Sequence, residues 1–173
     1  MPVKINGSSS GSVTLAAPAS GSDVTLTLPG TAGTVALASA NKILQIVRAT
    51  DTTRRTTTST SFADASLSVT ITPSAITSNI ILIATYYAEC ASNDAVKIAI
   101  TDSGNTAISA GEYGGVFSGS GVNQVAITKI AYASPASTSA VTYKIRYASN
   151  SGGSAVLYND LQTGQLLAIE VSV

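Results

Sequence analysis

The sequence contains no histidine, no tryptophan and a single cysteine in 173 residues. Histidine is the usual general base near neutral pH and the commonest transition-metal ligand, so its absence excludes Ser-His-Asp triads, Cys-His pairs and most zinc sites. One cysteine cannot form an internal disulfide. Cys90 follows the apolar run Ile80–Ala84, which favours a buried small hydrophobe over a reactive thiol. We therefore expect neither a metal nor a cofactor.

Charged residues are also scarce, at 10% of the chain, and nine basic side chains balance nine acidic ones. Nucleic-acid binding needs clustered Lys and Arg, and Arg54-Arg55 is the only basic doublet. On a strand this pair points to opposite faces, so we interpret it as a solvated segment. No apolar run approaches the roughly 20 residues of a membrane span, and the first residues lack the apolar stretch of a signal peptide. We expect no nucleic-acid partner, no membrane insertion and assembly in a cytoplasm.

The sequence is rich in small, β-branched and hydroxyl side chains. Hydrophobic residues make up 45% of the chain, and serine and threonine together supply about a quarter of it. Threonine and valine pack well on a pleated surface, whereas the good helix formers Glu, Lys, Gln and Arg are few. No segment of any length has a helical period. The composition therefore predicts an all-β protein.

Residues 1–41 differ from the rest because they have almost no charge and contain an internal repeat. Val-x-Leu recurs at a spacing of about eleven residues, and Pro18 and Pro29 keep the same spacing. Each unit predicts a short strand that is too small to bury its apolar face alone. We therefore expect a segment that folds in an assembly. Its interface side chains would be Val13, Leu15, Val24, Leu26, Val35 and Leu37.

Residues 42–173 have the pattern of an antiparallel β-sandwich, with jelly-roll-like build. Strands are predicted near Ile43–Val47, 66–72, Ile80–Tyr87, 96–100, 125–132, 141–147, 155–158 and 166–173. The run Ile80–Tyr87 is apolar on both faces, which indicates a central strand. In the last strand we expect Leu167, Ile169, Val171 and Val173 to point inward, and Glu170 and Ser172 to point outward.

Residues 50–61, TDTTRRTTTSTS, consist mostly of hydroxyl side chains around the arginine pair. Such a run cannot supply an apolar face. We interpret it as an exposed strand edge. The alternative is a segment that packs against another subunit through hydrogen bonds.

Two loop regions are candidates for binding, because loops at the end of a rigid sandwich often carry recognition. Tyr113 and Phe117 lie in the glycine-rich stretch 111–121, and Asn150 lies in the predicted turn 149–154, with Tyr158 shortly after. A ring near amides and hydroxyls suits a carbohydrate ligand. The alternative is that the rings of Tyr113 and Phe117 anchor their loop in the core or in a subunit interface.

The strongest catalytic hypothesis is glycoside hydrolysis, which needs a pair of carboxylates. Glu89, Asp94, Asp102 and Glu112 are the candidates, since they surround one predicted strand. Asp94 and Asp102, however, stand at ordinary turn positions. A substrate groove would also be rich in aromatic residues, and tryptophan is absent. We therefore expect a protein that is not an enzyme.

The stretches GSVTLAAPASGSDVTLTLPGTAGTVAL and KILQIVRATDTTRRTTTSTSFADASLSVTITPSAITSNIILIAT resemble short tail-fibre proteins of tailed bacteriophages, in particular those of marine and cyanobacterial hosts. The resemblance covers about the first half of the chain, and GQLLAIEVSV is similar to the closing strand of the same domain. It implies a virion protein with an N-terminal attachment or shaft segment and a β-sandwich head. It also implies a homotrimer that binds other virion proteins through its N-terminus. The family has no fixed catalytic residues.

Two alternatives stay open. This chain is short for a whole fibre, and a capsid decoration protein or head fibre can have the same build. The second alternative is a secreted or surface carbohydrate-binding module, which the missing signal peptide disfavours.

Overall fold

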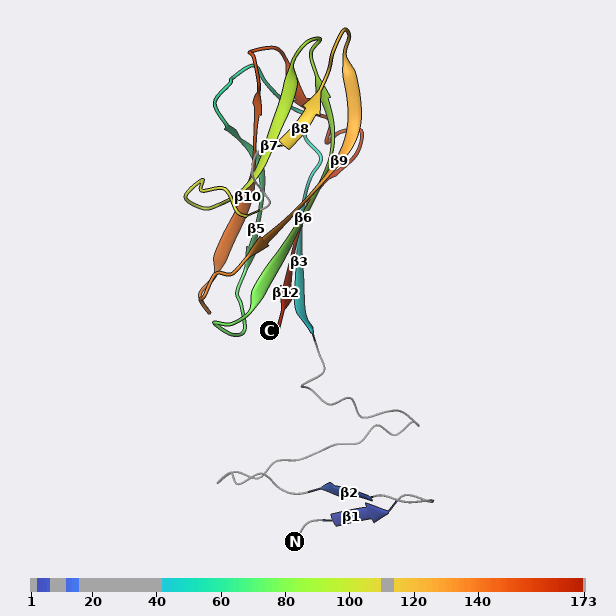
Figure 1. The fold of residues 1–173 in the computed structure, drawn as a ribbon, viewed down its shortest axis with the longest axis vertical. Helices are drawn as coiled ribbons and strands as arrows, with labels where there is room; N and C mark the ends of the chain where they lie inside the picture. The colour runs from blue at the N-terminus through green and yellow to red at the C-terminus, as the bar shows by residue number, and fades with distance from the viewer. Residues whose placement is uncertain (1–2, 7–11, 16–41, 110–113, 173) are drawn as a thin grey trace. The chain divides into compact units, whose positions relative to one another are not determined.

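In the computed structural model, residues 3–6, 12–15, 42–109 and 114–172 are described. The chain divides into two compact units, Met1–Ala38 and Ser39–Val173. Every regular element in the described ranges is a β-strand, and every pairing between these strands is antiparallel (Figure 1). The predicted all-β fold is therefore confirmed.

The first unit contains a hairpin of β1 (Val3–Asn6) and β2 (Ser12–Leu15). In this pairing Val13 lies opposite Ile5, and Leu15 lies opposite Val3. The first Val-x-Leu unit thus forms a strand, as its sequence predicts. The other two units, with Val24, Leu26, Val35 and Leu37, lie outside the described residues.

The second unit, here called the head, is a sandwich of two sheets, as the sequence predicts. The smaller sheet has the order β5 (Ala63–Ile71), β10 (Val141–Ser149), β7 (Ala95–Asp102) and β8 (Gly114–Phe117). The larger sheet has the order β3 (Ile43–Asp51), β12 (Gly164–Val171), β6 (Asn79–Cys90), β11 (Ala155–Leu157) and β4 (Arg55–Thr57). A sixth strand, β9 (Asn123–Ala133), pairs with the other edge of β6.

The strand boundaries agree with the sequence at most positions. β6 is central, since it pairs with β12 and β11 on one side and β9 on the other. β4 pairs with β11 and forms one edge of the larger sheet, which confirms the edge strand expected within 50–61. One strand was missed. β8 lies in the glycine-rich stretch that the sequence favours as a loop. It forms a strand because its pairing with β7 offsets the low β-propensity of its glycines.

The core lies between the inner faces of the two sheets. Alternate residues of β5 are buried, including Leu67, Val69 and Ile71, as their period of two predicts. Cys90 is fully buried at the end of β6, and burial raises the pKa of its thiol. The remaining larger members are Ile80, Leu82, Tyr86, Val96, Ile98, Ile100, Tyr143, Ile145, Tyr147, Leu157 and Leu166.

The facing predicted for β12 is wrong. Leu166, Ala168 and Glu170 are fully buried on the inner face, and the alternating residues from Leu167 to Val171 are only half-buried on the outer face. Glu170 can be buried because Ser74 and Gln45 donate hydrogen bonds to its carboxylate. These partners are far away in sequence, so alternation alone could not reveal them.

The head has two distinct ends, which can be followed in Figure 1. The base is the end where β3 begins and β12 finishes; there the Ser172 N–H donates to the Lys42 carbonyl at 2.9 Å. The tip is the opposite end, formed by the loops 91–94, 118–122 and 149–154. The strand β6 connects the two, from Asn79 at the base to Cys90 at the tip.

Candidate functional site

The three tip loops are tied together by backbone hydrogen bonds. Asn93 N–H donates to the Gly119 carbonyl at 2.7 Å, and Ser118 N–H donates to the Asp94 carbonyl at 2.9 Å. On the other side, Ala91 N–H donates to the Ser154 carbonyl at 2.9 Å. Because each loop satisfies backbone groups of its neighbour, the tip forms one connected unit.

The carboxylate of Asp94 is the centre of this unit. It is 2% exposed and accepts five hydrogen bonds. Oδ1 accepts from Ala95 N (2.7 Å), Ser151 N (2.8 Å) and Ser151 Oγ (2.8 Å), and Oδ2 accepts from Ser149 Oγ (2.7 Å) and Gly153 N (2.7 Å). Burial by itself raises the pKa of Asp94, but the bonds from Ser149 and Ser151 outweigh it and hold the pKa well below its usual range. Asp94 therefore braces the turn 149–154.

Glycine is required at one position of this brace. A Cβ at Gly153 would lie 2.6 Å from Asp94 Oδ2 and 2.9 Å from Ala91 Cβ. The close approach lets the Gly153 N–H reach the carboxylate. The predicted turn at 149–154 is thus confirmed, and its hydrogen bonds to Asp94 hold it against the loop 91–94.

Two of the predicted binding residues lie at this tip, on either side of β7. Phe117 is 68% exposed at the end of β8, opposite Ala95 of β7. The Asn150 backbone N–H donates to the carbonyl of the same Ala95 at 2.9 Å, and Asn150 is exposed. Val122, 65% exposed, lies in the neighbouring loop. A third predicted binding residue, Tyr113, lies outside the described residues.

Tyr158, the remaining predicted residue, lies in different surroundings. Its ring is only 7% exposed and lies under the guanidinium of Arg54, whose Cζ is 4.1 Å from the ring centroid. Its hydroxyl donates to Glu89 Oε2 at 2.8 Å. Gln124 donates to the same carboxylate oxygen, and Tyr87 donates to Gln124 Oε1 at 3.1 Å. Tyr158 therefore offers its ring to Arg54 and leaves little surface for a ligand.

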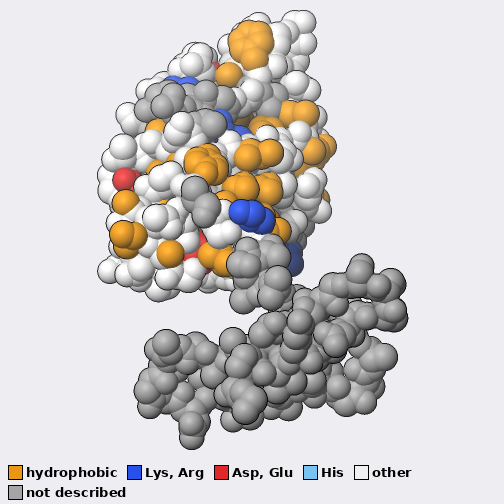
Figure 2. Space-filling model, turned by 60° about the horizontal axis from the view of Figure 1, so that its bottom comes forward, with side chains coloured by type: hydrophobic (Ala, Val, Ile, Leu, Met, Phe, Trp, Pro, Cys, Tyr) orange, Lys and Arg blue, Asp and Glu red, His pale blue; other side chains and the backbone are white. Residues whose placement is uncertain are grey.

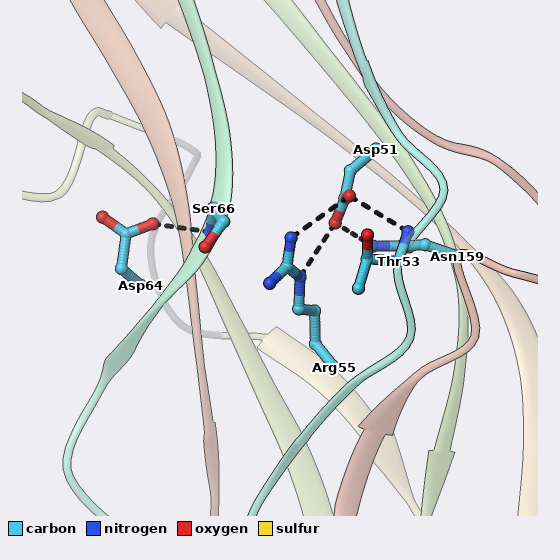
Figure 3. Close-up of polar contacts among 6 residues, drawn as sticks. All are labelled: Asp51, Thr53, Arg55, Asp64, Ser66 and Asn159. Atoms are coloured by element: carbon cyan, nitrogen blue, oxygen red, sulfur yellow. Dashed lines mark hydrogen bonds and ion pairs between the residues drawn. The ribbon is translucent and has the colours of Figure 1, made fainter.

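Asp51 is the centre of a second polar cluster (Figure 3). The side chains of Arg55, at 3.0 and 3.2 Å, and Asn159, at 2.9 Å, donate to the Asp51 carboxylate, as does Thr53 N–H at 3.0 Å. Burial raises the pKa of Asp51, but the bonds from Arg55, Thr53 and Asn159 outweigh it and lower the pKa. This cluster was not predicted, because Asn159 lies 108 positions from Asp51 in the sequence.

Figure 3 also shows Asp64 Oδ1 accepting from Ser66 N–H at 2.7 Å within β5. Ser66 has a positive φ of 55°, and the β5–β10 register shifts nearby. This local turn makes an irregularity in the strand and is separate from the Asp51 cluster.

The carboxylates considered for glycoside hydrolysis lie far apart or already accept hydrogen bonds from neighbouring groups. Asp94 lies just before β7 and Asp102 lies at its other end, about 26 Å apart on strand geometry, whereas a hydrolytic pair is about 5–10 Å apart. Asp102 Oδ1 accepts from Thr106 N–H at 2.8 Å within its turn. Glu89 already accepts from Gln124 and Tyr158. Glu112 lies outside the described residues.

A hollow of about 560 Å³ lies near the base, away from the tip. Asp102, Ile108, Tyr132, Pro135, Thr142 and Tyr143 are among its lining residues. Across the described ranges, no three His, Cys, Asp or Glu residues gather as a metal site would require. The same part of the chain forms no helix long and apolar enough to cross a membrane.

Comparison with known proteins adds no relative: no protein-family model and no curated protein matches this chain.

Proposed function

We propose that this chain is a structural protein of a phage particle, a short tail fibre that joins the particle through residues 1–41 and presents a trimeric β head to the host surface. The observation that carries the proposal is the separation of the two ends of the head. The chain enters at the base, before Ile43, and the exposed Phe117 and Asn150 lie on the braced tip at the other end. An attachment protein needs this polarity.

The mechanism is association without chemistry. Loops held in one conformation lose little entropy when they bind, so the bracing by Asp94 favours affinity at the tip. An exposed aromatic ring can stack on the face of a sugar, and an amide can hydrogen-bond to sugar hydroxyls. Phe117 and Asn150 provide these two groups, and the ligand class that suits them is a host-surface carbohydrate.

The test uses phage particles that carry single substitutions in this protein. Phe117→Ser and Asn150→Ala should each lower the adsorption rate several-fold, since they remove a ligand contact without touching the core. Ile76→Ser is the matched control, because Ile76 is 65% exposed in a loop next to the base. Adsorption that is equal in all three variants would contradict a receptor-binding tip.

Deletion of residues 1–38 tests the attachment half of the proposal. The truncated chain should fold but no longer appear in purified particles. Normal incorporation would contradict the role given to the N-terminal segment. If particles lacking the protein adsorb normally but their capsids burst at a lower temperature, the protein is a decoration protein and the fibre assignment is wrong.

A further inference from the structure

The outer face of the larger sheet carries apolar side chains on four adjacent strands near the base. The register places Ile46, Ile169, Ile81 and Tyr132 in one row across β3, β12, β6 and β9. The next row towards the tip contains Arg48, Leu167, Ile83 and Ile130, and the row nearest the base contains Ile43 and Val171. We call the nine apolar side chains of these rows the apolar base: Ile43, Ile46, Ile81, Ile83, Ile130, Tyr132, Leu167, Ile169 and Val171.

The described part of the chain leaves this face open to solvent. Ile46 and Ile130 are each 58% exposed, Ile43 is 57% exposed and Tyr132 is 48% exposed. These four are among the most exposed large hydrophobic side chains of the head. They lie on β3 and β9, and the half-buried side chains of β12 and β6 lie between them. Figure 2 shows hydrophobic side chains gathered over one face of the head, beside basic ones. Scattered apolar residues are ordinary on a surface, but a contiguous group on four strands marks a contact surface.

The size of the apolar base suits the centre of a subunit interface. Strands lie about 4.8 Å apart and alternate residues about 6.7 Å apart, so four strands and three rows cover about 20 Å by 20 Å, on the order of 400 Å². A standard interface takes about 800 Å² from each partner, with an apolar centre and a polar rim. The next row supplies such a rim, since it consists of Thr50, Gln165, Thr85 and Thr128.

The charge on this face favours a second copy of the same chain as the occupant. Within the four rows described, Arg48 is the sole charged side chain, and it lies on β3 at the edge of the group. Two copies therefore meet without carboxylate repulsion, and each arginine can turn towards water. A membrane surface would call for several basic residues around the apolar group, and a foreign partner of defined charge would call for a matching pattern. The basic residues at this place are Arg48 and the exposed Lys42 before Ile43, fewer than a membrane-binding surface carries, and the rows hold no charge pattern for a foreign partner.

We infer that the apolar base is the surface through which heads of this protein contact one another. The inference rests on the proposed function, because it assigns the contact surface of the proposed homotrimer. The position of the surface agrees with that assembly: Ile43 follows directly on the N-terminal segment, so copies joined through residues 1–41 bring their bases together at high local concentration. The tips then remain free.

The test uses a tryptophan reporter, since the natural chain has no tryptophan. Tyr132→Trp places one indole in the apolar base of the full-length protein. Leu161→Trp is the control, because Leu161 is 70% exposed in the loop between β11 and β12. Acrylamide quenching is measured at a concentration where light scattering reports an oligomer. We expect a quenching constant several-fold lower for Tyr132→Trp than for Leu161→Trp.

Two further conditions identify the occupant. Dilution to monomer, or addition of Ile46→Glu and Ile130→Glu, should raise the quenching constant of the Tyr132→Trp protein to that of the control. Both glutamates replace exposed side chains, and circular dichroism confirms that the variants are folded. Shielding that persists in the monomer would overturn the inference, because it would show that the chain covers its own apolar base.

The oligomeric state separates this inference from the proposed function. A trimer in which the Tyr132→Trp indole is as quenchable as the control overturns the inference and leaves the fibre assignment standing. A monomer at all concentrations overturns both. A shielded indole in an oligomer other than a trimer supports the contact surface and contradicts the proposed symmetry.

Discussion

Glu170 of β12 lies opposite Gln45 of β3, and the Gln45 side chain donates a 2.6 Å hydrogen bond to the Glu170 carboxylate. Ser74 donates to the other carboxylate oxygen through both its N–H, at 2.7 Å, and its hydroxyl, at 2.6 Å. Glu170 is fully buried. Burial raises the pKa, but the bonds from Ser74 and Gln45 outweigh it and lower the pKa to about 2 from an ordinary value of 4.5.

This pKa predicts that acid destabilises the head. In the unfolded chain Glu170 binds a proton below about pH 4.5, whereas in the folded protein it stays charged down to about pH 2. Its contribution to the free energy of unfolding is therefore complete above pH 4.5 and is lost as the pH falls to 2. Asp94, whose pKa is also lowered, acts in the same direction below its ordinary value of 3.8. Urea unfolding at several pH values measures the slope.

Glu170→Gln should reduce that slope between pH 4.5 and 2 and cost about 2 kcal/mol at neutral pH, because an amide cannot accept every bond that the carboxylate accepts. Glu89→Gln is a suitable comparison, since Glu89 lies on the outer face and is half-buried. An unchanged acid slope in Glu170→Gln would show that Glu170 does not carry the effect.

Asp94→Asn should loosen the tip. Five donors point at the two carboxylate oxygens, and an asparagine side chain offers one oxygen and adds two donors of its own. We expect a loss of about 2–4 kcal/mol in the free energy of unfolding. Hydrogen exchange of the amides in 149–154 should also become faster. Asp160→Asn, at an exposed position, should change neither measurement.

Gly153→Ala should destabilise the protein by about 1–3 kcal/mol, because the added methyl group meets Asp94 Oδ2 and Ala91 Cβ. Gly119→Ala is a matched control in a neighbouring tip loop, where a Cβ would meet nothing within 4 Å. That control should stay within about 0.5 kcal/mol of the natural protein. Thermal unfolding of both variants makes the comparison, and equal losses would mean that the close approach at Gly153 is relieved by movement.

Arg54→Ala should lower the free energy of unfolding by about 0.5–1 kcal/mol, because it removes the guanidinium from the face of the Tyr158 ring. Arg48→Ala changes the same side chain at an exposed position on β3 and should cost less. Urea unfolding measures both. A larger loss for Arg48→Ala would contradict a stabilising role for the stacked pair.

The sequence predicted the strands well where alternation was strong. Leu67, Val69 and Ile71 face the core as their spacing requires, and the apolar run of β6 is central. It failed for β12, where both faces carry large aliphatic groups and the one charged residue suggested an outward face. Glu170 faces inward because Ser74 and Gln45 satisfy it there.

The candidate site was predictable only in part. Glycine and serine at 149–154 indicated a turn. Phe117 and Asn150 are both exposed, although Phe117 ends strand β8 instead of lying in the expected loop. Nothing in the sequence brought Asp94 to that turn, since Ser149, Ser151 and Gly153 are more than fifty positions away. Likewise, local sequence did not predict that the Arg54 guanidinium would stack on the Tyr158 ring.

The all-β fold follows from the local sequence pattern, because period-two alternation, abundant β-branched residues and scarce helix formers leave strands as the way to bury apolar surface. The tertiary structure decided which residues share a face and which polar groups meet. Strand register aligned Ile46, Ile81 and Tyr132 on the outer face, and loop packing gathered five donors around Asp94. Both outcomes depend on contacts between distant segments, which local pattern does not encode.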